Sequence, residues 1–279
     1  MRVDILKESG FCGGVSRALH LLDKTIKENP NKPIYLIGPI VHNSLVNQKY
    51  LDKGVVFITE GDLYKLDDES IVVISAHGLS NKSKEKLKRF NVVDTTCPYV
   101  VKNKMLIDGA IGYDILFIGK KGHSETNALT QDDESIKIIS DVKDLDKFSS
   151  NSYGMVYNQT TFNINNLKKI QNEIVSRAPF YIINDTMCMT SRSLQEFLLH
   201  KDERYNKCII VGDQTSSNAN SLYEMSPYNE TYFISNSNEV DKIFIRNTDS
   251  IIIIGSASTP KDELKKIKDK IKSRIKNDG

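Results

Sequence analysis

Short apolar runs alternate with segments of helical length along the whole of this 279-residue chain. This alternation is typical of an α/β protein whose sheets are largely parallel. The runs that predict strands are 3–6, 34–37, 55–58, 71–74, 92–93, 115–118, 136–139, 153–156, 181–183, 208–211, 231–234 and 251–254. Helices are predicted in most of the segments between them.

Three of these predicted strands are followed by similar loops. The sequences are "GPIVHNSLV" after 34–37, "GKKGHSETNAL" after 115–118 and "GDQTSSNANSL" after 208–211. A glycine closes each strand, and a polar residue follows four positions later, ahead of a predicted helix. The glycines are Gly38, Gly119 and Gly212, and the polar residues are His42, His123 and Ser216.

Two further features recur with the same order. The loops "SAHGLS", "NQTTFN" and "GSASTP" follow later strands and contain His77, Thr160 and Ser258. The cysteines Cys12, Cys97 and Cys188 precede the three glycines by 26, 22 and 24 residues. The sequence therefore predicts three α/β units of roughly 90 residues related by pseudo-threefold symmetry.

The cysteines also suggest where the units end. Strands lead into Cys97 and Cys188, which close the first two units, whereas the third unit has no such cysteine at its end. The strand before Cys12 is expected to fill that place by pairing with 251–254. We therefore expect domains at 13–97 and 98–188, and a third at 189–279 completed by the N-terminal strand 1–12.

Composition and charge exclude several classes of protein. The net charge is +2, and the one basic run, 265–276, has the apolar spacing of an amphipathic helix between Leu264 and Ile275. Neither feature favours a nucleic-acid partner. Since no segment approaches the roughly 20 apolar residues of a membrane span, we expect a soluble, intracellular, cytoplasmic protein. Four widely separated cysteines do not suggest a disulfide framework.

Three cysteines at matched positions allow more than one chemistry. They could be buried apolar residues, three ligands of a zinc ion with water as the fourth, or ligands of an iron–sulfur cluster with one iron left without a protein ligand. No CxxC pair is present. Cys208 lies inside the apolar run "CIIVG" and is predicted to be an ordinary core residue.

The polar loops suit a compact anionic ligand such as a phosphate or diphosphate. They carry imidazole, hydroxyl and amide groups at the carboxyl ends of strands, where parallel sheets bind their ligands. The candidates are His42, His77, His123, Ser216, Ser217, Asn218 and Ser258. Helix capping is the alternative role of the serines and the asparagine.

Among these donors, Glu125 is the one carboxylate. It is either an N-terminal helix charge or a proton donor. The remaining histidines, His20 and His200, fall within helical patterns and are expected at the surface.

Together these motifs resemble a known family. The stretches "GFCGGVSRA", "IGPIVHN", "SAHG", "DTTCP", "GHSE", "NQTT", "DTMC", "SSN" and "SASTP" occur in the order of 4-hydroxy-3-methylbut-2-enyl diphosphate reductase, from Cys12 to Pro260. One departure follows Cys188, where the family usually has Ala-Thr and then Arg-Gln but this chain reads "MTSRSLQ". No RNA-binding repeat of the kind some relatives carry is appended.

The resemblance implies a trefoil of three α/β domains around a central 4Fe-4S cluster held by Cys12, Cys97 and Cys188. It implies reductive removal of the allylic hydroxyl to give isopentenyl and dimethylallyl diphosphate, the last step of the methylerythritol phosphate route to isoprenoids. The matching histidines, Ser216, Ser217, Asn218 and Ser258 would hold the diphosphate, and Glu125 would relay protons with Thr160 beside it. An external electron donor of the ferredoxin or flavodoxin type is also implied.

Two other classes use overlapping residues. A zinc-dependent hydrolase of a phosphorylated substrate would use the same cysteine, histidine and glutamate set. A non-enzymatic protein that binds a small anion would need the polar loops but not the three cysteines. Neither a P-loop nor a GxGxxG sequence is present, so a nucleotide cofactor is not predicted.

Overall fold

The described part of the chain contains three separate four-stranded sheets, and every pairing within them is parallel. The computed structural model describes residues 2–146 and 148–277, with only the backbone described for 275–277. Met1, Asp278 and Gly279, at the ends of the predicted third domain, and the side chain of Ile275 therefore lie outside the described residues. The predicted fold class, three α/β units, is confirmed.

The three sheets share one strand order. The first is β3 (Val56–Ile58), β2 (Ile34–Ile37), β4 (Ile71–Ile74), β5 (Asn91–Asp94), and the second is β7 (Lys137–Ile139), β6 (Asp114–Ile118), β8 (Gly154–Asn158), β9 (Tyr181–Ile183). The third is β11 (Glu230–Ile234), β10 (Lys207–Val211), β12 (Ser250–Gly255), β1 (Arg2–Ile5). All the predicted strands are therefore present, and their ends differ from the prediction by at most two residues.

The N-terminal strand closes the third sheet, as predicted from the absence of a cysteine at the end of the third repeat. Val3 pairs with Ile251 and Ile5 with Ile253, and the amide of Leu6 donates to the carbonyl of Ile253 over 2.9 Å. In each sheet, the strand that leads into a cysteine is thus an edge strand beside the third strand of its unit.

Packing groups the chain into two compact units, which differ from the three repeated α/β units of the sequence and are called the first and the second unit from here on. One contains residues 1–12, 42–46 and 189–279, and hence the third sheet; the other contains 13–41 and 47–188, and hence the first two sheets. The chain passes between the units directly after Cys12, on either side of the segment 42–46, and directly after Cys188.

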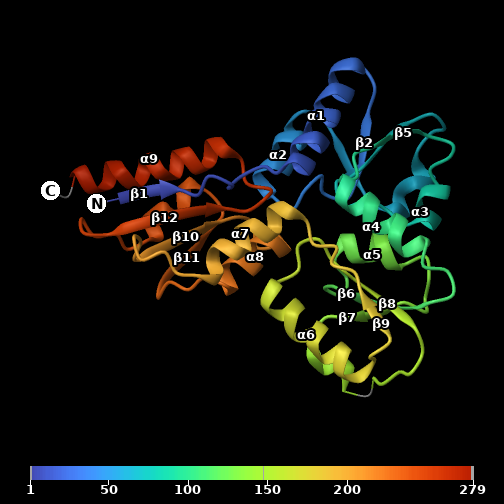
Figure 1. Ribbon diagram of the computed structural model, residues 1–279. Helices are drawn as coiled ribbons and strands as arrows, with labels where there is room; N and C mark the ends of the chain where they lie inside the picture. The colour runs from blue at the N-terminus through green and yellow to red at the C-terminus, as the bar shows by residue number, and fades with distance from the viewer. Residues whose placement is uncertain (1, 147, 278–279) are drawn as a thin grey trace. The chain divides into compact units, whose positions relative to one another are not determined.

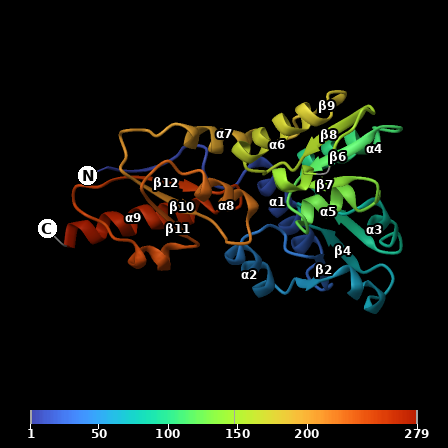
Figure 2. The ribbon, with the colours of Figure 1, turned by 90° about the horizontal axis from the view of Figure 1, so that it is seen from below.

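Helices cover both faces of the third sheet, as buried parallel strands require. Figure 1 shows α9 (Lys261–Asn277) on one face and α7 (Met189–Leu199) with α8 (Ser217–Glu224) on the other, and in Figure 2 the same helices are seen from below, overlapping the strands. Leu264, Ile267 and Ile271 of α9 pack against the sheet, so the basic run forms an amphipathic helix whose apolar face is buried.

The second unit carries the remaining α-helices of the described residues. They are α1 (Gly13–Glu28), α2 (Ser44–Asp52, whose first turn belongs to the other unit), α3 (Asn81–Glu85), α4 (Pro98–Asp108), α5 (Ser124–Thr130) and α6 (Ile164–Arg177). No helix among the described residues is long and apolar enough to cross a membrane.

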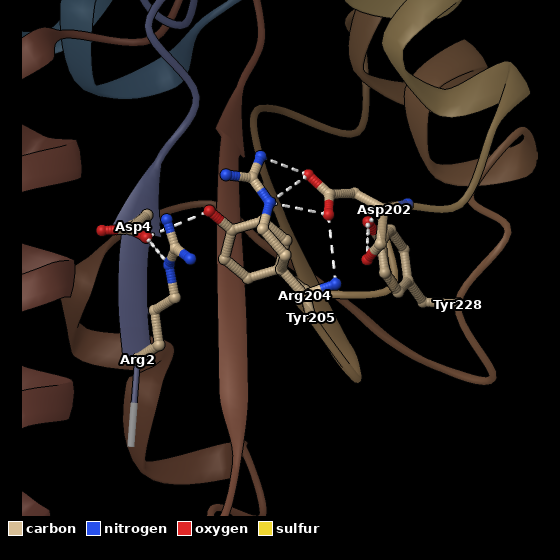
Figure 3. Close-up of polar contacts among 6 residues, drawn as sticks. All are labelled: Arg2, Asp4, Asp202, Arg204, Tyr205 and Tyr228. Atoms are coloured by element: carbon tan, nitrogen blue, oxygen red, sulfur yellow. Dashed lines mark hydrogen bonds and ion pairs between the residues drawn. The ribbon is translucent and has the colours of Figure 1, made fainter.

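Polar contacts tie β1 to its sheet at the amino ends of the strands (Figure 3). The hydroxyl of Tyr205 donates to the Asp4 carboxylate over 3.0 Å, and Arg2 donates to the same carboxylate. The guanidinium carbons of Arg2 and Arg204 lie 5.2 and 5.6 Å from the centre of the Tyr205 ring, within cation–π range. These contacts lie at the end of the sheet opposite the loops that follow the strands, so they leave those loops free to carry the site.

Candidate functional site

The three cysteines occupy equivalent positions, each in the connection between the edge strand of a sheet and the next helix. Each is the residue directly before a helix: Cys12 before α1, Cys97 before α4 and Cys188 before α7. In each case the cysteine amide donates to a carbonyl in the loop after the neighbouring strand, to Ala257 over 3.1 Å, Ala76 over 2.9 Å and Thr160 over 3.1 Å, respectively. An equivalent backbone hydrogen bond thus anchors each of the three cysteines.

This shared position suits thiolate ligands. All three cysteines are partly buried, and the unpaired N–H groups at a helix start favour negative charge nearby. Cys208 differs, because it lies inside β10 with no exposed surface and burial raises the pKa of its thiol to about 12. A thiol that stays protonated is a poor metal ligand, so Cys208 is a core residue, as predicted.

The cysteines are divided between the two units, Cys12 in one and Cys97 with Cys188 in the other. Neither unit alone therefore supplies three thiolates. Within the described residues, no group of three or more His, Cys, Asp or Glu side chains is arranged to hold a metal ion. Taken singly, each of the three cysteines has the chemistry and the backbone anchoring expected of a thiolate ligand.

Glu125 and Thr160 form a direct pair beside Cys188 in the second unit. Thr160 donates to both carboxylate oxygens of Glu125, from its amide to Oε1 and from its hydroxyl to Oε2, each over 2.7 Å. The carbonyl of Thr160 accepts from the amide of Cys188. A continuous set of hydrogen bonds therefore links the carboxylate to the backbone of a cysteine.

The environment of Glu125 changes its acidity. Only 3% of the surface of Glu125 is exposed. Burial raises the pKa of its carboxyl from the ordinary 4.5 to about 7, although the hydrogen bonds from Thr160 oppose that rise. A carboxylic acid with a pKa near neutrality is suited to donating a proton and recovering it. Glu125 is thus more than an exposed charge at a helix start.

Two of the predicted histidines lie close to this pair. His123 caps α5, and its Nδ1 accepts from the amide of Glu125 over 3.2 Å. His77, in the loop after β4, has its ring centre 6.1 Å from that of His123 in an edge-to-face arrangement. The structure therefore gathers His77, His123, Glu125 and Thr160 within the second unit.

The other predicted anion-binding residues gather in the first unit. The hydroxyl of Ser258 donates to the carbonyl of His42 over 3.0 Å, which joins the loop after β12 to the segment 42–46. The loop after β10 runs into α8, where Ser216 is the N-cap and Ser217 the first helical residue. Capping is therefore a real role of Ser216, whose hydroxyl accepts from the amide of Ala219 over 3.3 Å.

Asn218 is buried and only half paired. Its Nδ2 donates to the hydroxyl of Ser191 over 2.7 Å, while its Oδ1 has no hydrogen-bond partner among the described residues. A buried polar atom without a partner is costly, so such an atom commonly marks a ligand or water site. This feature fits the predicted anion site.

The sequence reasoning missed two residues of this first-unit site. Ser191, which holds Asn218, lies in the stretch "MTSRSLQ" where the chain departs from the family. Asp213 follows Gly212 at the end of β10 and binds the first residue of α2. A carboxylate directly after a strand-closing glycine was the available signal for Asp213. His20 and His200 are exposed, as expected.

The fold and these loops define a class: an α/β protein of three parallel sheets, with one backbone-anchored cysteine after the edge strand of each sheet and polar side chains in the loops that follow the strands. Comparison with known proteins agrees with this class. The family model described as LytB protein matches residues 3–272, and the chain belongs to this family.

Two curated relatives of this chain have the same enzyme name. The chain is 32% identical to the 4-hydroxy-3-methylbut-2-enyl diphosphate reductase of Clostridium acetobutylicum over 93% of its own length, but spans only 41% of that longer protein. It is 30% identical to the enzyme of the same name from Geobacillus kaustophilus, over 100% of this chain and 92% of the relative.

A solved structure extends the likeness to the fold. The E-1-hydroxy-2-methyl-but-2-enyl-4-diphosphate reductase from Plasmodium falciparum superposes with a TM-score of 0.88 at 28% identity, covering 95% of this chain and 86% of that one.

Proposed function

We infer that this chain reduces 4-hydroxy-3-methylbut-2-enyl diphosphate, removing its allylic hydroxyl to yield isopentenyl and dimethylallyl diphosphate at the end of the non-mevalonate isoprenoid pathway. Family membership supports the reaction class. The observation that carries the proposal is the repeated anchoring of three cysteines, together with the hydrogen bonds that join Glu125 and Thr160 to one of them.

We propose that Cys12, Cys97 and Cys188 hold a 4Fe-4S cluster. When bound, the cluster would supply electrons and Lewis acidity at the iron that has no cysteine ligand. The reaction consumes two electrons and two protons and releases water. As the family implies, the electrons are proposed to come from an external carrier of the ferredoxin or flavodoxin type.

The diphosphate is assigned to the polar residues of the loops that follow the strands. In the first unit these are His42, Ser216, Ser217, Asn218 and Ser258, and in the second His77, His123 and Thr160. Asn218 illustrates the fit. If its amide is rotated by half a turn, Oδ1 accepts from the Ser191 hydroxyl and the NH2 group is left to donate to a phosphate oxygen.

Glu125 is assigned the proton transfer to the leaving oxygen. Its protonated form can donate through Oε2 to the Thr160 hydroxyl, 2.7 Å away, which can in turn donate outward. Because the pair is buried, bulk water does not compete for this proton. The chain is further proposed to be cytoplasmic and to consist of domains 13–97, 98–188 and 189–279 with 1–12.

The test is anaerobic purification followed by iron and sulfide analysis and a visible spectrum. We expect a brown protein with broad absorption near the ultraviolet, and loss of iron when Cys12, Cys97 or Cys188 is changed to Ser, because a hydroxyl replaces thiolate poorly at iron. Cys208→Ser is the matched control and should keep its iron.

Two results would contradict the cluster assignment. One is a colourless wild-type protein with stoichiometric zinc, as expected of a hydrolase. The other is loss of iron in Cys208→Ser while Cys188→Ser retains it.

A further inference from the structure

Asp213 joins two segments that lie far apart in the sequence. Its Oδ2 accepts from both the amide of Ser44, over 2.9 Å, and the hydroxyl of Ser44, across a separation of 169 residues. Its Oδ1 accepts from the amide and hydroxyl of Thr215, over 2.9 and 2.7 Å. The residue is 8% exposed, so a buried carboxylate receives four hydrogen bonds.

These contacts bear on the segment 42–46, which belongs to the first unit although the chain on both sides of it belongs to the second. The segment is tied to the first unit at two points. Ser258 donates to the carbonyl of His42 over 3.0 Å, and Asp213 accepts from Ser44 two residues later. Each tie comes from a different strand-end loop.

An ordinary helix cap does not explain this arrangement. The start of α2 already has a local cap, because Oδ1 of Asn43 accepts from the amide of Val46 over 3.1 Å. The Asp213 contact is additional and tertiary. Placing a buried negative charge in a loop that is proposed to bind an anion is unfavourable in itself, so the charge needs a compensating role.

We propose that Asp213 is a positioning residue. It fixes the segment 42–46, which carries His42, against the loop that carries Ser216 and Asn218. Together with the loop of Ser258, these segments then form one anion site before the ligand binds. The inference rests on the proposed function, since it assumes that these loops bind diphosphate. All four hydrogen bonds to the Asp213 carboxylate come from Ser44 and Thr215, so the negative charge is offset by protein donors. Preorganisation of this kind raises affinity by lowering the ordering cost of binding.

The test is Asp213→Asn, measured in the anaerobic cluster-loaded protein with inorganic diphosphate as the probe. Asparagine can still accept from Thr215, but its NH2 group cannot accept from the Ser44 amide, which is left unpaired. The loss of one hydrogen bond to a charged group predicts a dissociation constant for diphosphate raised roughly 10-fold or more. KM should rise with little change in kcat, and amide exchange in 42–46 should become faster.

A second variant and a control keep the result interpretable if Asp213→Asn folds poorly. Ser44→Ala removes only the hydroxyl contact and should weaken diphosphate binding by a smaller factor in the same direction. Asp202→Asn removes a hydrogen-bonded carboxylate at the opposite end of the same sheet, and its diphosphate affinity should match the wild type.

The positioning role is overturned if Asp213→Asn binds diphosphate as the wild type does, or more tightly, since tighter binding would mean that charge repulsion outweighs positioning. An enzyme that binds diphosphate in this Asp213-dependent way but never reduces the substrate would contradict the proposed function and leave this inference standing. An active enzyme with unchanged Asp213→Asn affinity would contradict the inference alone.

Discussion

Glu125→Gln separates proton delivery from binding and stability. Glutamine keeps the size of glutamate and can still accept from the Thr160 amide, but it has no carboxylic proton to donate. General acid–base groups contribute about 100-fold to 10,000-fold in rate. We therefore expect turnover with a chemical reductant to fall at least about 100-fold, while iron content and diphosphate affinity stay unchanged.

The raised pKa of Glu125 also predicts how the wild type responds to pH. With a folded-state pKa of about 7, the protonated acid is lost as pH rises through 7, so turnover should fall up to tenfold per pH unit above that value. Glu125→Gln should show a low rate without this descending limb. Glu173→Gln changes a partly exposed carboxylate on α6 of the same unit, which pairs with Arg177, and should keep the wild-type profile.

The stability contributed by Glu125 should also fall as pH rises, but over a lower pH range than activity. The folded pKa of Glu125 lies above its ordinary 4.5, so the folded state binds more protons than the unfolded state between these values. The contribution of Glu125 to the free energy of unfolding is therefore fully present below about pH 4.5 and is lost as pH rises through 7. A difference of 7 minus 4.5 corresponds to a loss on the order of 3 kcal/mol.

Because glutamine does not ionise, Glu125→Gln should lose less stability than the wild type between pH 5 and pH 8.5. Urea unfolding at these two pH values measures the difference. Near-normal turnover of Glu125→Gln would refute the proton-donor role, and equal pH dependence of unfolding in both proteins would refute the buried, raised-pKa state.

Two further predictions concern the first unit. Ser216→Ala combined with Asn218→Ala should raise the dissociation constant for inorganic diphosphate by roughly 10-fold or more at unchanged iron content, because hydrogen bonds to charged groups contribute about 1.5–3 kcal/mol each; unchanged affinity would contradict their role. Lys207→Met should lower the free energy of unfolding by about 3–5 kcal/mol in urea titration, because Lys207 is fully buried and pairs with Asp249 over 2.8 Å, and its loss leaves that buried carboxylate without its cation. Adding Asp249→Asn should recover part of the loss, and no recovery would contradict this account.

The sequence predicted the elements well because strand signals are local. Runs such as 34–37 and 71–74 coincide with strands β2 and β4, and the matched cysteine positions found the residues that the structure anchors by the same hydrogen bond. The pairing of Val3 with Ile251 was predictable for a different reason. A threefold repeat that lacks one strand at its end must obtain it from elsewhere in the chain.

Tertiary contacts between polar residues left no such signal. Lys207 reads in the sequence as a charged residue ahead of a strand. It is nevertheless fully buried, because Glu230 and Asp249, at the starts of the two neighbouring strands of the third sheet, pair with it. Asp213 reads as a loop residue, and only the fold brings Ser44 to it. Hydrogen bonds between distant residues do not follow a periodicity, so patterns along the chain cannot reveal them.

Glu125 and Asp213 show how environment divides one chemical group between two roles. Both carboxylates are buried at the carboxyl ends of strands, but Glu125 receives two hydrogen bonds, from Thr160 alone, and burial raises its pKa to about 7. Burial acts on Asp213 in the same direction, but the four hydrogen bonds from Ser44 and Thr215 outweigh it and lower its pKa to about 2. A group that gains and loses a proton near neutral pH can take part in proton transfer, whereas a permanently ionised one can only hold its donors in place. The number of donors around each carboxylate thus supports the proposed proton transfer by Glu125 and the proposed positioning by Asp213.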